Sequence, residues 1–415
     1  MSFISLLLYI IAVYLRPQEW LPAMNGWPLI YILTITTAIF VILETPKRKQ
    51  THLTAPPNLL MLGFLGCILF SHISNGYLQG TIDSFNDFAP NVVMFFLFVN
   101  ILTTERKIKI AIWLIIILTV ILAIEGIQQH YKGIGWAGQT PYLDKERQEF
   151  RIRWIGIFND PNDLALVFVI GIGFLMSFLF GKLNFLIKVT SIIMLFTIGY
   201  ALFYTNSRGG FLALSAMILF IFLRRMKNKL LSLSLGGLLA FIVILFGPSR
   251  MSDMSASEAS AYGRIESWYQ GFQMLKSAPI FGVGYRMFAD YHFQTAHNSY
   301  ILIAAETGIV GLFVWLSLVY LCFKGLVIVG WRNYTSKSYL LGLEAALVGF
   351  MSAGYFLSRS YIMVLYLLLA LAASFEYINL RKEEYAFTRK DRHILLAVTM
   401  GTLALLWFSM RFLIK

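Results

Sequence analysis

The chain has 415 residues, of which 58% are hydrophobic and only 13% are charged. Because soluble domains carry about 25% charged residues, this composition excludes an ordinary soluble fold. The formal net charge of +13 is explained by Lys and Arg in cytoplasmic loops, and no basic stripe indicates a nucleic-acid partner.

Apolar segments recur along the whole chain and predict an all-α, polytopic membrane protein with one integral-membrane domain over 1–415. The first and fourth segments are short and suit a re-entrant or interfacial placement. Twelve to fourteen crossings therefore stay open, and we expect about 12–13 transmembrane helices. The thirteen segments are 3–15, 28–43, 58–74, 89–102, 109–127, 163–180, 185–204, 209–223, 230–247, 301–327, 339–357, 360–378 and 394–413.

The short loops between alternate segments are basic, which places them in the cytoplasm by the positive-inside rule. The opposite loops then face outward, and they include the two long ones, 128–162 and 248–298. We expect any chemistry on this outer face, close to the membrane surface. The basic loops contain Lys47, Arg48 and Lys49, then Arg106 and Lys107, Lys182, Arg224, Arg225, Lys227 and Lys229, Lys337, and finally Arg381, Lys382, Arg389, Lys390 and Arg392.

Neither the cysteines nor the amino-terminal run indicates a special role. Cys67 and Cys322 lie inside apolar runs, which favours small hydrophobic side chains over a disulfide or a metal site. The run 3–15 has no cationic residues before it and no small-residue cleavage site after it. It therefore predicts a retained apolar segment rather than a cleaved signal peptide.

The outward loop 248–298 is the most hydrophilic interval of its length. Its small polar residues 251–260 predict a mobile tip. The apolar spacing from Ser267 to Lys276 predicts a short amphipathic helix, which Pro279 and the following glycines end.

The loop leads into a helix with a predicted break. Asn298 and Ser299 predict a helix cap, and the first helical part is expected to run to Glu306. Gly308 and Gly311 then permit an interruption before the full span.

Arg208 lies in the sequence TNSRGG between two apolar runs with almost no loop, so it must sit at or just within the outer membrane boundary. One interpretation is an arginine at a helix end whose guanidinium reaches the interface. The other is a functional site, because ionisable residues at membrane depth are candidates by default. The two glycines after it would let backbone N–H groups approach an anion.

Arg264 lies in the sequence YGRIESW. It is either a neighbour of Glu266 on a solvated helix start or a ligand for phosphate, since a planar guanidinium suits bidentate binding of phosphate oxygens. The spacing alone leaves both interpretations open.

His297 lies where the polar loop meets the apolar segment that starts at Ile301. Histidine changes protonation state near neutral pH, which suits a general base, although a structural role at a helix N-terminus is the alternative. The presence of two outward-facing arginines, and of Asn298 and Glu306 nearby in the sequence, favours the catalytic role of His297 over the structural one. A positive pair would hold a diphosphate while a neutral base takes a hydroxyl proton, so the combination predicts a glycosyl-transfer site.

The end of the first long loop has two interpretations. The sequence FNDPND over 158–163 favours a turn that caps the next helix. Arg151 and Arg153 before it stay candidates for contacting a polyanionic or sugar ligand. The chain has no P-loop, zinc-ligand spacing or GxSxG motif, and the glycines of 281–284 do not follow a strand as a nucleotide loop would. No cofactor or metal is therefore expected.

Several of these motifs, in this order and spacing, resemble the bacterial O-antigen ligase and O-antigen polymerase family. The resemblance covers about 150–311. It is carried by RWIGIFNDPND at 153–163, SRGG at 207–210, GRIESW at 263–268, AP-FGVG at 278–284 and AHNSYILIAAETGIVG at 296–311.

The resemblance implies a glycosyltransferase of the bacterial inner membrane whose two long loops are periplasmic. Its donor would be a glycan on undecaprenyl diphosphate, its acceptor lipid A–core or another periplasmic glycan, and its setting the membrane lipids. The reaction is expected to be inverting and metal-independent. The family's functional positions match Arg208, Arg264 and His297 within their motifs. Substrate-binding candidates beside them are Arg151, Arg153, Trp268, Asn298 and Glu306.

Two other functions compete with ligation. A polymerase of the same family would use the same donor site and add the glycan to another lipid-linked repeat. A flippase would carry polar residues through the bilayer midplane and pseudo-repeated halves. Few ionisable residues lie mid-span, with Glu125 and Glu344 the nearest cases, and no repeat is evident. A purely structural scaffold would leave the outward-facing arginines unexplained.

Overall fold

The computed structural model describes residues 1–44, 54–144, 149–245, 259–331, 336–381, 384 and 386–413. Three features predicted from the sequence therefore lie outside the described residues. They are the basic run 47–49, most of the predicted mobile tip at 251–258, and Lys382.

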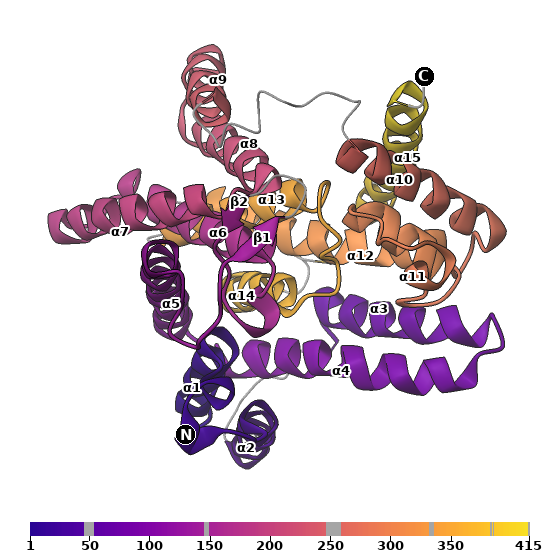
Figure 1. Ribbon diagram of the computed structural model, residues 1–415, viewed down its shortest axis with the longest axis horizontal. Coiled ribbons are helices and arrows are strands. Elements are labelled where there is room, and N and C mark those ends of the chain that lie inside the picture. The colour runs from indigo at the N-terminus through magenta and orange to yellow at the C-terminus, as the bar shows by residue number, and fades with distance from the viewer. Residues whose placement is uncertain are drawn as a thin grey trace. The chain divides into compact units, whose positions relative to one another are not determined.

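The described chain is almost entirely helical, with one short antiparallel pair of strands, β1 (Tyr142–Asp144) and β2 (Glu149–Arg151). The predicted all-α class is confirmed. The helices are α1 (Ser2–Leu15), α2 (Leu29–Glu44), α3 (Pro56–Ile73), α4 (Leu78–Ile101), α5 (Glu105–Lys132), α6 (Pro161–Leu179), α7 (Phe185–Tyr204), α8 (Arg208–Arg225), α9 (Lys229–Leu245), α10 (Ala259–Ser277), α11 (Phe288–Tyr291), α12 (Ser299–Trp331), α13 (Lys337–Ala353), α14 (Met363–Asn379) and α15 (Arg389–Leu413) (Figure 1).

Each of the thirteen apolar segments corresponds to a helix of its own, but α13 ends at Ala353, four residues before the end of its predicted segment, and α14 begins at Met363, three residues after the start of its segment. Seven helices of the described chain are long and apolar enough to cross a membrane, namely α3, α4, α5, α6, α7, α12 and α15. Four shorter apolar helices are α1, α2, α9 and α14. The protein is a multi-pass membrane protein, while the exact number of crossings stays a prediction.

Contacts divide the chain into two compact units. The first comprises Met1–Gln50, Asn100–Asp253 and Leu326–Ala353, and the second comprises Thr51–Val99, Met254–Gly325 and Gly354–Lys415. Arg151, Arg153 and Arg208 belong to the first unit, whereas Arg264 and His297 belong to the second. A single integral-membrane domain over 1–415 stays a prediction.

The first unit is built around α6, which packs against α5, α7, α8 and α13. Figure 1 shows α6 between α7 and α13. A helix that is apolar on all faces is buried, and small residues allow its neighbours to approach closely. A Cβ on Gly171 would lie 2.9 Å from Thr119 Cγ2, and one on Gly173 would lie 2.8 Å from Met217 Sδ. Both glycines therefore mark close helix crossings.

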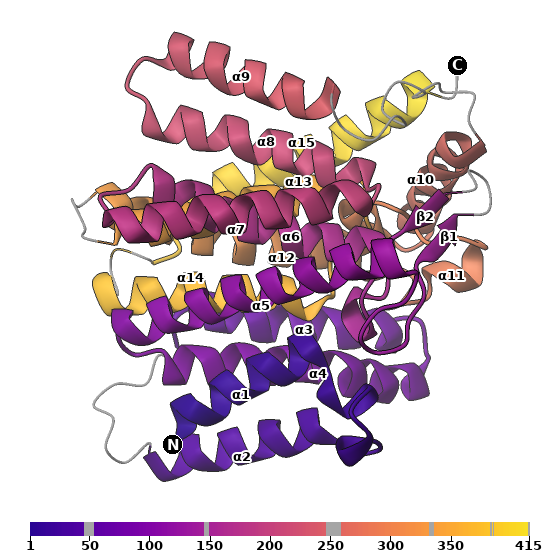
Figure 2. The ribbon, with the colours of Figure 1, turned by 60° about the vertical axis from the view of Figure 1, so that its left-hand side comes forward.

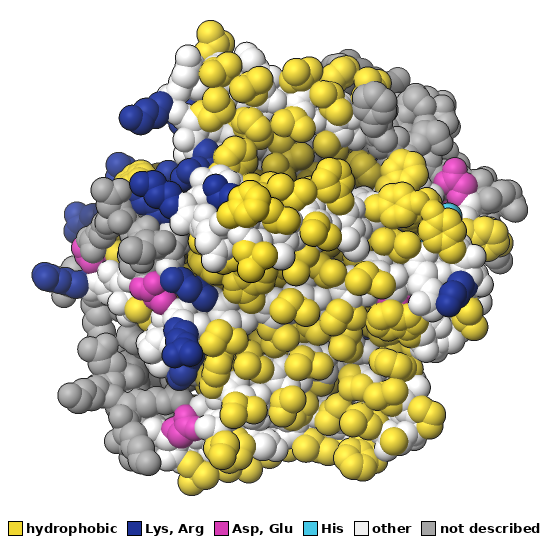
Figure 3. Space-filling model, turned by 90° about the vertical axis from the view of Figure 1, so that its left-hand side faces the viewer, with side chains coloured by type: hydrophobic (Ala, Val, Ile, Leu, Met, Phe, Trp, Pro, Cys, Tyr) yellow, Lys and Arg dark blue, Asp and Glu magenta, His cyan; other side chains and the backbone are white. Residues whose placement is uncertain are grey.

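One end of the first unit is basic. Arg225 at the end of α8 donates to the carbonyl of Phe180 at the end of α6, and Lys109 near the start of α5 lies over the ring of Tyr339 in α13. Figure 2 shows these helices running side by side. Figure 3 shows the apolar face beside them, with most Lys and Arg side chains along one edge. This pattern agrees with the predicted cytoplasmic loops, although the orientation itself stays a prediction.

The opposite end of the first unit carries the long loop 128–162. It contains a strand pair that was not predicted from the sequence, in which β1 and β2 pair with Tyr142 opposite Arg151. The N–H of Ile152 donates to the carbonyl of Tyr204 at the end of α7 over 3.1 Å. The strand pair is thereby attached directly before the turn that leads to Arg208.

In the second unit, α10 begins at Ala259, which extends the helix predicted over Ser267–Lys276 towards the N-terminus. A glycine inside a helix costs about 1 kcal/mol, and Gly263 lies in the added part. Packing outweighs this cost, because Ile265 in the same added turns is buried.

Candidate functional site

His297 lies two residues before the start of α12 and has a left-handed backbone conformation, with φ of 48°. Asn298, which is fully buried, fixes the residues that follow it. Its Oδ1 accepts from the N–H groups of Tyr300 (2.9 Å) and Ile301 (3.1 Å), so the predicted cap is confirmed. Its Nδ2 donates to the carbonyl of Tyr355 over 3.0 Å.

Ser299, the next residue, is hydrogen-bonded to the distant segment 354–360. The N–H of Ser299 donates to the carbonyl of Gly354 (2.7 Å), and its hydroxyl donates to the carbonyl of Leu357 (2.6 Å). The same hydroxyl accepts from the N–H of Arg359 (2.9 Å), and Ser360 donates to the Ser299 carbonyl (2.9 Å). Residues 354–360 therefore clamp the backbone directly after His297.

Arg264 is half-buried in α10. Residues near it in this helix contact the segment 292–294, which leads to His297. The Ser267 hydroxyl lies 3.2 Å from His292 Nε2, and a Cβ on Gly263 would lie 3.3 Å from Gln294 Oε1. Because residues 263 and 267 flank Arg264 in the helix, this turn of α10 is placed against the segment 292–294.

Trp268 joins α10 to the start of α12. It is 6% exposed and belongs to one apolar cluster with Ala296 and Ile301. Its ring meets that of Tyr355 edge-on, with centroids 5.4 Å apart. Its indole N–H is buried without a hydrogen-bond partner among the described residues. The role of Trp268 in this structure is to pack α10 beside the His297 loop.

The predicted break in α12 is present at Gly308, with φ of 70° and ψ of −172°. This region of backbone space is essentially restricted to glycine. The interrupted helix is completed by the loop 279–284. Val283 N–H donates to the carbonyl of Ala305 (2.9 Å), and Ile309 N–H donates to that of Pro279 (2.9 Å). The glycine-rich motif is thus a backbone partner of the helix break and not a nucleotide loop.

Glu306 precedes this break and is 2% exposed. Its Oε1 accepts from the N–H of Phe288 at 3.3 Å, and its carbonyl accepts from the N–H of Gly284 at 3.1 Å. Its other carboxyl oxygen is buried with no hydrogen-bond partner among the described residues. Glu306 therefore binds the loop 284–288 to α12.

Arg208 is the first residue of α8 and is half-buried. Ser207 caps the helix, since its hydroxyl accepts from Gly210 N–H (3.1 Å) and donates to Asn162 Oδ1 (2.8 Å). Asn206 before it has a left-handed φ of 48°. The two loop ends at Asn162 and Ser207 are therefore joined by a direct hydrogen bond beside Arg208.

Arg151 and Arg153 differ sharply in their surroundings. Arg151 is 8% exposed; its Nε donates to the carbonyl of Thr205 (2.8 Å) and its Nη2 to Asn162 Oδ1 (2.9 Å). Arg153 is half-buried and donates from Nε to the carbonyl of Thr140 over 2.9 Å. Arg151 thus holds the turn before Arg208, while Arg153 is the more accessible of the two.

The structure brings Arg264, Trp268, Asn298 and His297 into one unit around a shared apolar cluster, and it gathers Arg151 and Arg208 at one end of the other. That Arg208, Arg264 and His297 share one pocket stays a prediction. Among the described residues, no group of three or more His, Cys, Asp or Glu side chains could hold a metal ion.

The clamp at 354–360 was not predicted from the sequence, which assigned most of these residues to the apolar segments 339–357 and 360–378. Its signal was the run GYFLSRSY over 354–361, which is polar and glycine-containing between two apolar segments. Serine hydroxyls commonly bond to nearby backbone groups, so such a run is suited to hold a neighbouring loop.

A comparison with known protein families identifies one domain of the chain. Residues 192–316 match the model of the family described as O-antigen ligase. Residues 192–316 thus form an O-antigen ligase family domain. The matched stretch contains Arg208, Arg264 and His297, and it extends past the break at Gly308. No curated protein matches the chain.

Family membership supports a ligase- or polymerase-type function, with lipid-linked glycan and lipid substrates in general. Arg151 and Arg153 lie outside the matched stretch. The match over 192–316 therefore favours a membrane enzyme of glycosyltransferase type.

Proposed function

We propose that this protein moves a glycan from undecaprenyl diphosphate to lipid A–core or another periplasmic acceptor. The active site would face the periplasm from the bacterial inner membrane. The family match over 192–316 supports the class of reaction, and the three candidate residues lie within it.

His297 acts as the general base in this proposal. It takes the proton of the acceptor hydroxyl as that oxygen attacks C1 of the donor sugar. The bond between C1 and the diphosphate oxygen breaks, and undecaprenyl diphosphate leaves with the electron pair. Attack on the face opposite the leaving group inverts the configuration at C1.

Arg208 and Arg264 bind the diphosphate and stabilise the charge that builds on it. Guanidinium groups make paired, charge-assisted hydrogen bonds with phosphate oxygens, so two of them supply countercharge without a metal ion. Arg153 is proposed to contact the glycan, and Trp268 to act on substrate binding by packing α10 beside the segment of His297. Asn298 would act by capping α12 directly after His297, and Glu306 by holding the loop 284–288 against α12.

The observation that carries the proposal is the way His297 is held. The left-handed backbone of His297, followed directly by two hydrogen-bonded residues, fixes the point from which its side chain leaves the chain, and general-base catalysis requires a positioned side chain. Asn298 supplies the helix cap, and Ser299 is bonded on three sides by the segment 354–360. These hydrogen bonds hold the backbone around His297 more firmly than the start of a helix by itself requires.

Replacing His297 tests the proposal directly. His297→Asn keeps a side chain that tolerates the left-handed conformation but removes the base. With purified protein, a synthetic undecaprenyl-diphosphate glycan and lipid A–core, we expect transfer to fall about 10²- to 10⁴-fold. His297→Ala should behave likewise while the protein still inserts in the membrane.

The matched control is His393→Asn, which removes an exposed imidazole from α15. It should leave transfer unchanged. Full activity of both His297 variants would remove the base assignment.

A polymerase of the same family is the alternative, because the family match supports both activities equally. Lipid profiling of a deletion strain separates them. Loss of a ligase should leave long lipid-linked polymer, whereas loss of a polymerase should leave single lipid-linked repeats. Donor trapped on the cytoplasmic face would instead identify a flippase and overturn the proposal.

A further inference from the structure

Arg286 has a backbone conformation that its residue type rarely adopts. Its φ is 58°, in the left-handed region that favours glycine. Three other non-glycine residues of the described chain share this region, namely Arg16, Asn206 and His297. Arg16 terminates α1, where a left-handed residue is common, and asparagine tolerates the region. His297 is the proposed base, so the strain at Arg286 is the case that asks for a reason.

The backbone on both sides of Arg286 is held in place by α12. Gly284 N–H donates to the carbonyl of Glu306 over 3.1 Å, and Phe288 N–H donates to the carboxyl of Glu306 over 3.3 Å. These hydrogen bonds fix the loop two residues before and two residues after Arg286. The strained arginine is therefore presented from a defined point.

The side chain of Arg286 lies at the surface beside an acid. Its Nη2 lies 3.0 Å from Asp87 Oδ2 in α4, and its guanidinium lies over the ring of Tyr285, 5.6 Å from the centroid. Tyr285 also donates its hydroxyl to Asp87. The side chain of Arg286 is 65% exposed and that of Asp87 is 35% exposed. An ion pair this exposed contributes little to stability, so it does not offset the backbone strain.

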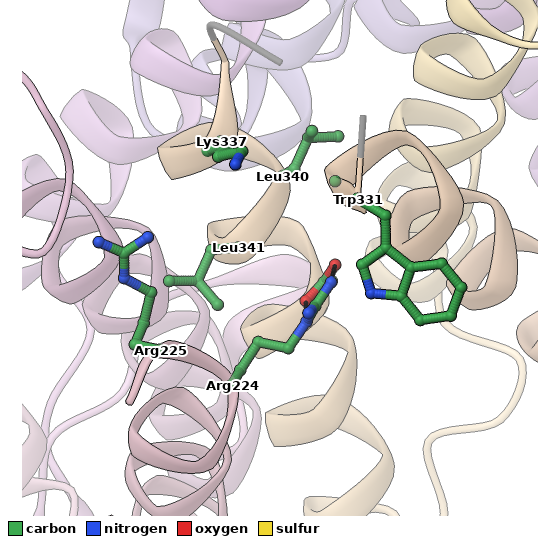
Figure 4. Close-up of a pocket in the computed structure, with 8 residues that line it drawn as sticks. Arg224, Arg225, Trp331, Lys337, Leu340 and Leu341 are labelled. Atoms are coloured by element: carbon green, nitrogen blue, oxygen red, sulfur yellow. Dashed lines mark hydrogen bonds and ion pairs between the residues drawn. The ribbon is translucent and has the colours of Figure 1, made fainter. Parts of the chain in front are cut away.

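Arg224 in the first unit shows the features of a structural arginine. It lines a pocket at the end of α8 (Figure 4), and it contacts Glu344 twice, with 2.8 Å from Nε to Oε2 and 3.2 Å from Nη2 to Oε1. Glu344 is 2% exposed, and Arg224 lies inside a regular helix. Removing Arg224 would take this partner from a buried carboxylate, which is strongly destabilising. Arg286 has the opposite features, an exposed partner and a strained backbone, so stability does not explain it.

Arg286 and His297 flank one short segment of the second unit. Phe288 and Ala296, at the two ends of this segment, pack in the same apolar cluster. Arg286 precedes the segment by two residues, and His297 follows it directly. The exposed pair of Arg286 and Asp87 therefore lies at the same end of the second unit as the proposed base.

We propose that Arg286 and Asp87 bind hydroxyl groups of a sugar ring in a glycan substrate. A guanidinium only donates hydrogen bonds and a carboxylate only accepts them, whereas a hydroxyl does both. Neighbouring hydroxyls of one ring can thus accept from Arg286 and donate to Asp87. Because the two charges are opposite, the pair suits a neutral sugar better than a phosphate. This subsite rests on the proposed transfer function, and the sugar belongs to the donor or to the acceptor.

Two substitutions remove one half of the pair each. Arg286→Gly removes the guanidinium and relieves the backbone strain, and Asp87→Ala removes the acceptor. Asp83→Ala is the matched control. Asp83 is exposed on α4 one turn before Asp87, and it accepts from Gln79 Nε2 over 3.0 Å.

The measurement is the dissociation constant of the purified full-length protein for two pairs of ligands. One pair is undecaprenyl diphosphate with and without a synthetic glycan, and the other is lipid A with and without its core sugars. Wild type should prefer the glycosylated ligand. Arg286→Gly and Asp87→Ala should each lower this preference about tenfold, as expected for a hydrogen bond to a charged group. The pair of ligands in which it falls identifies the donor or the acceptor as the source of the sugar.

Stability separates binding from a structural role. The melting temperature of Arg286→Gly should be no lower than that of wild type, because the lost ion pair is exposed and the strain is relieved. Asp83→Ala should leave the preference for glycan unchanged.

Three results would overturn the proposal. The first is an unchanged preference in both variants, or no preference in wild type, for either pair of ligands. The second is an equal fall with Asp83→Ala, which would make the charge of α4 the cause. The third is a lower melting temperature of Arg286→Gly, which would make the ion pair a structural contact. Failure of the proposed transfer has a different result, since wild type would then prefer the glycosylated ligand without transferring its glycan.

Discussion

Arginine side chains of the first unit illustrate how surroundings decide a residue's role. Arg208 begins α8 half-buried, whereas Arg151 is buried and bonded to the turn that precedes it. Arg153 is half-buried, and its guanidinium donates one hydrogen bond to a backbone carbonyl. The three arginines should therefore respond differently to the same kind of substitution.

Arg208→Lys should lower transfer about 10- to 100-fold, because an ammonium cannot replace the forked contact of a guanidinium and a charged hydrogen bond contributes about 1.5–3 kcal/mol. The assay is transfer by purified protein, with membrane insertion checked by fractionation. Arg106→Lys, at an exposed position of α5, is the conservative control and should be silent. Wild-type rates for Arg208→Lys would reject bidentate diphosphate binding at this position.

Arg151→Gln should destabilise the protein by about 1–3 kcal/mol, because the carbonyl of Thr205 and the Asn162 amide oxygen lose a buried donor. Arg153→Gln breaks only an exposed bond, so a change of about 0.5 kcal/mol is expected. Unfolding of the purified proteins in detergent measures both. If Arg153→Gln is the more destabilising, Arg151 is not the anchor of the turn.

At the scale of elements, the break in α12 is the feature on which the second unit depends. The interruption frees backbone groups, and the loop 279–284 satisfies them from outside the helix. A Cβ on Gly308 would lie 2.2 Å from the carbonyl oxygen of Ile280, and one on Gly282 would lie 2.3 Å from the backbone of Glu306. Backbone packs directly on backbone here, which leaves no room for a side chain.

Gly308→Ala should therefore destabilise the protein by at least about 1–3 kcal/mol from backbone strain alone, with the steric clash in addition. Thermal unfolding and the yield of folded protein report the effect. Gly66→Ala is the matched control, since nothing lies within 4 Å of a Cβ at that position in α3. Equal tolerance of both changes would show that α12 does not need the break.

At the scale of the whole molecule, the distribution of charge predicts how the protein sits in the membrane. Arg225 and Lys109 lie at one end of the first unit, and the strand pair with Arg151, Arg153 and Arg208 lies at the other. Positively charged loops are retained in the cytoplasm, so the second end is predicted to face the periplasm.

Cysteine labelling tests this orientation. Tyr142→Cys in β1 should react with an impermeant thiol reagent in intact spheroplasts, and Lys227→Cys should react only after the membrane is opened. The natural cysteines, Cys67 and Cys322, are both buried and should give little background. The reverse labelling pattern would place the proposed active site in the cytoplasm and exclude a periplasmic acceptor.

Much of the fold was predictable because it rests on local physics. An apolar run long enough for a bilayer must form a helix, since only a helix satisfies its own backbone within lipid. A helix accordingly forms over most of each of the thirteen segments. The cap at Asn298 and the break at Gly308 were predicted for the same reason: they follow from the conformational preferences of single residues.

The contacts that build the candidate site depended instead on tertiary structure. Ser299 is bonded by residues about sixty positions later, and Arg151 is bonded by Thr205 across 54 positions. No local pattern specifies such partners, because they are set by which helices pack together. The sequence by itself determined a helical membrane protein and the residue types of its chemistry. Only the tertiary structure decided which polar side chains anchor loops and which remain for a substrate. The reason is that the burial of a side chain and the position of its partners depend on how distant segments pack together.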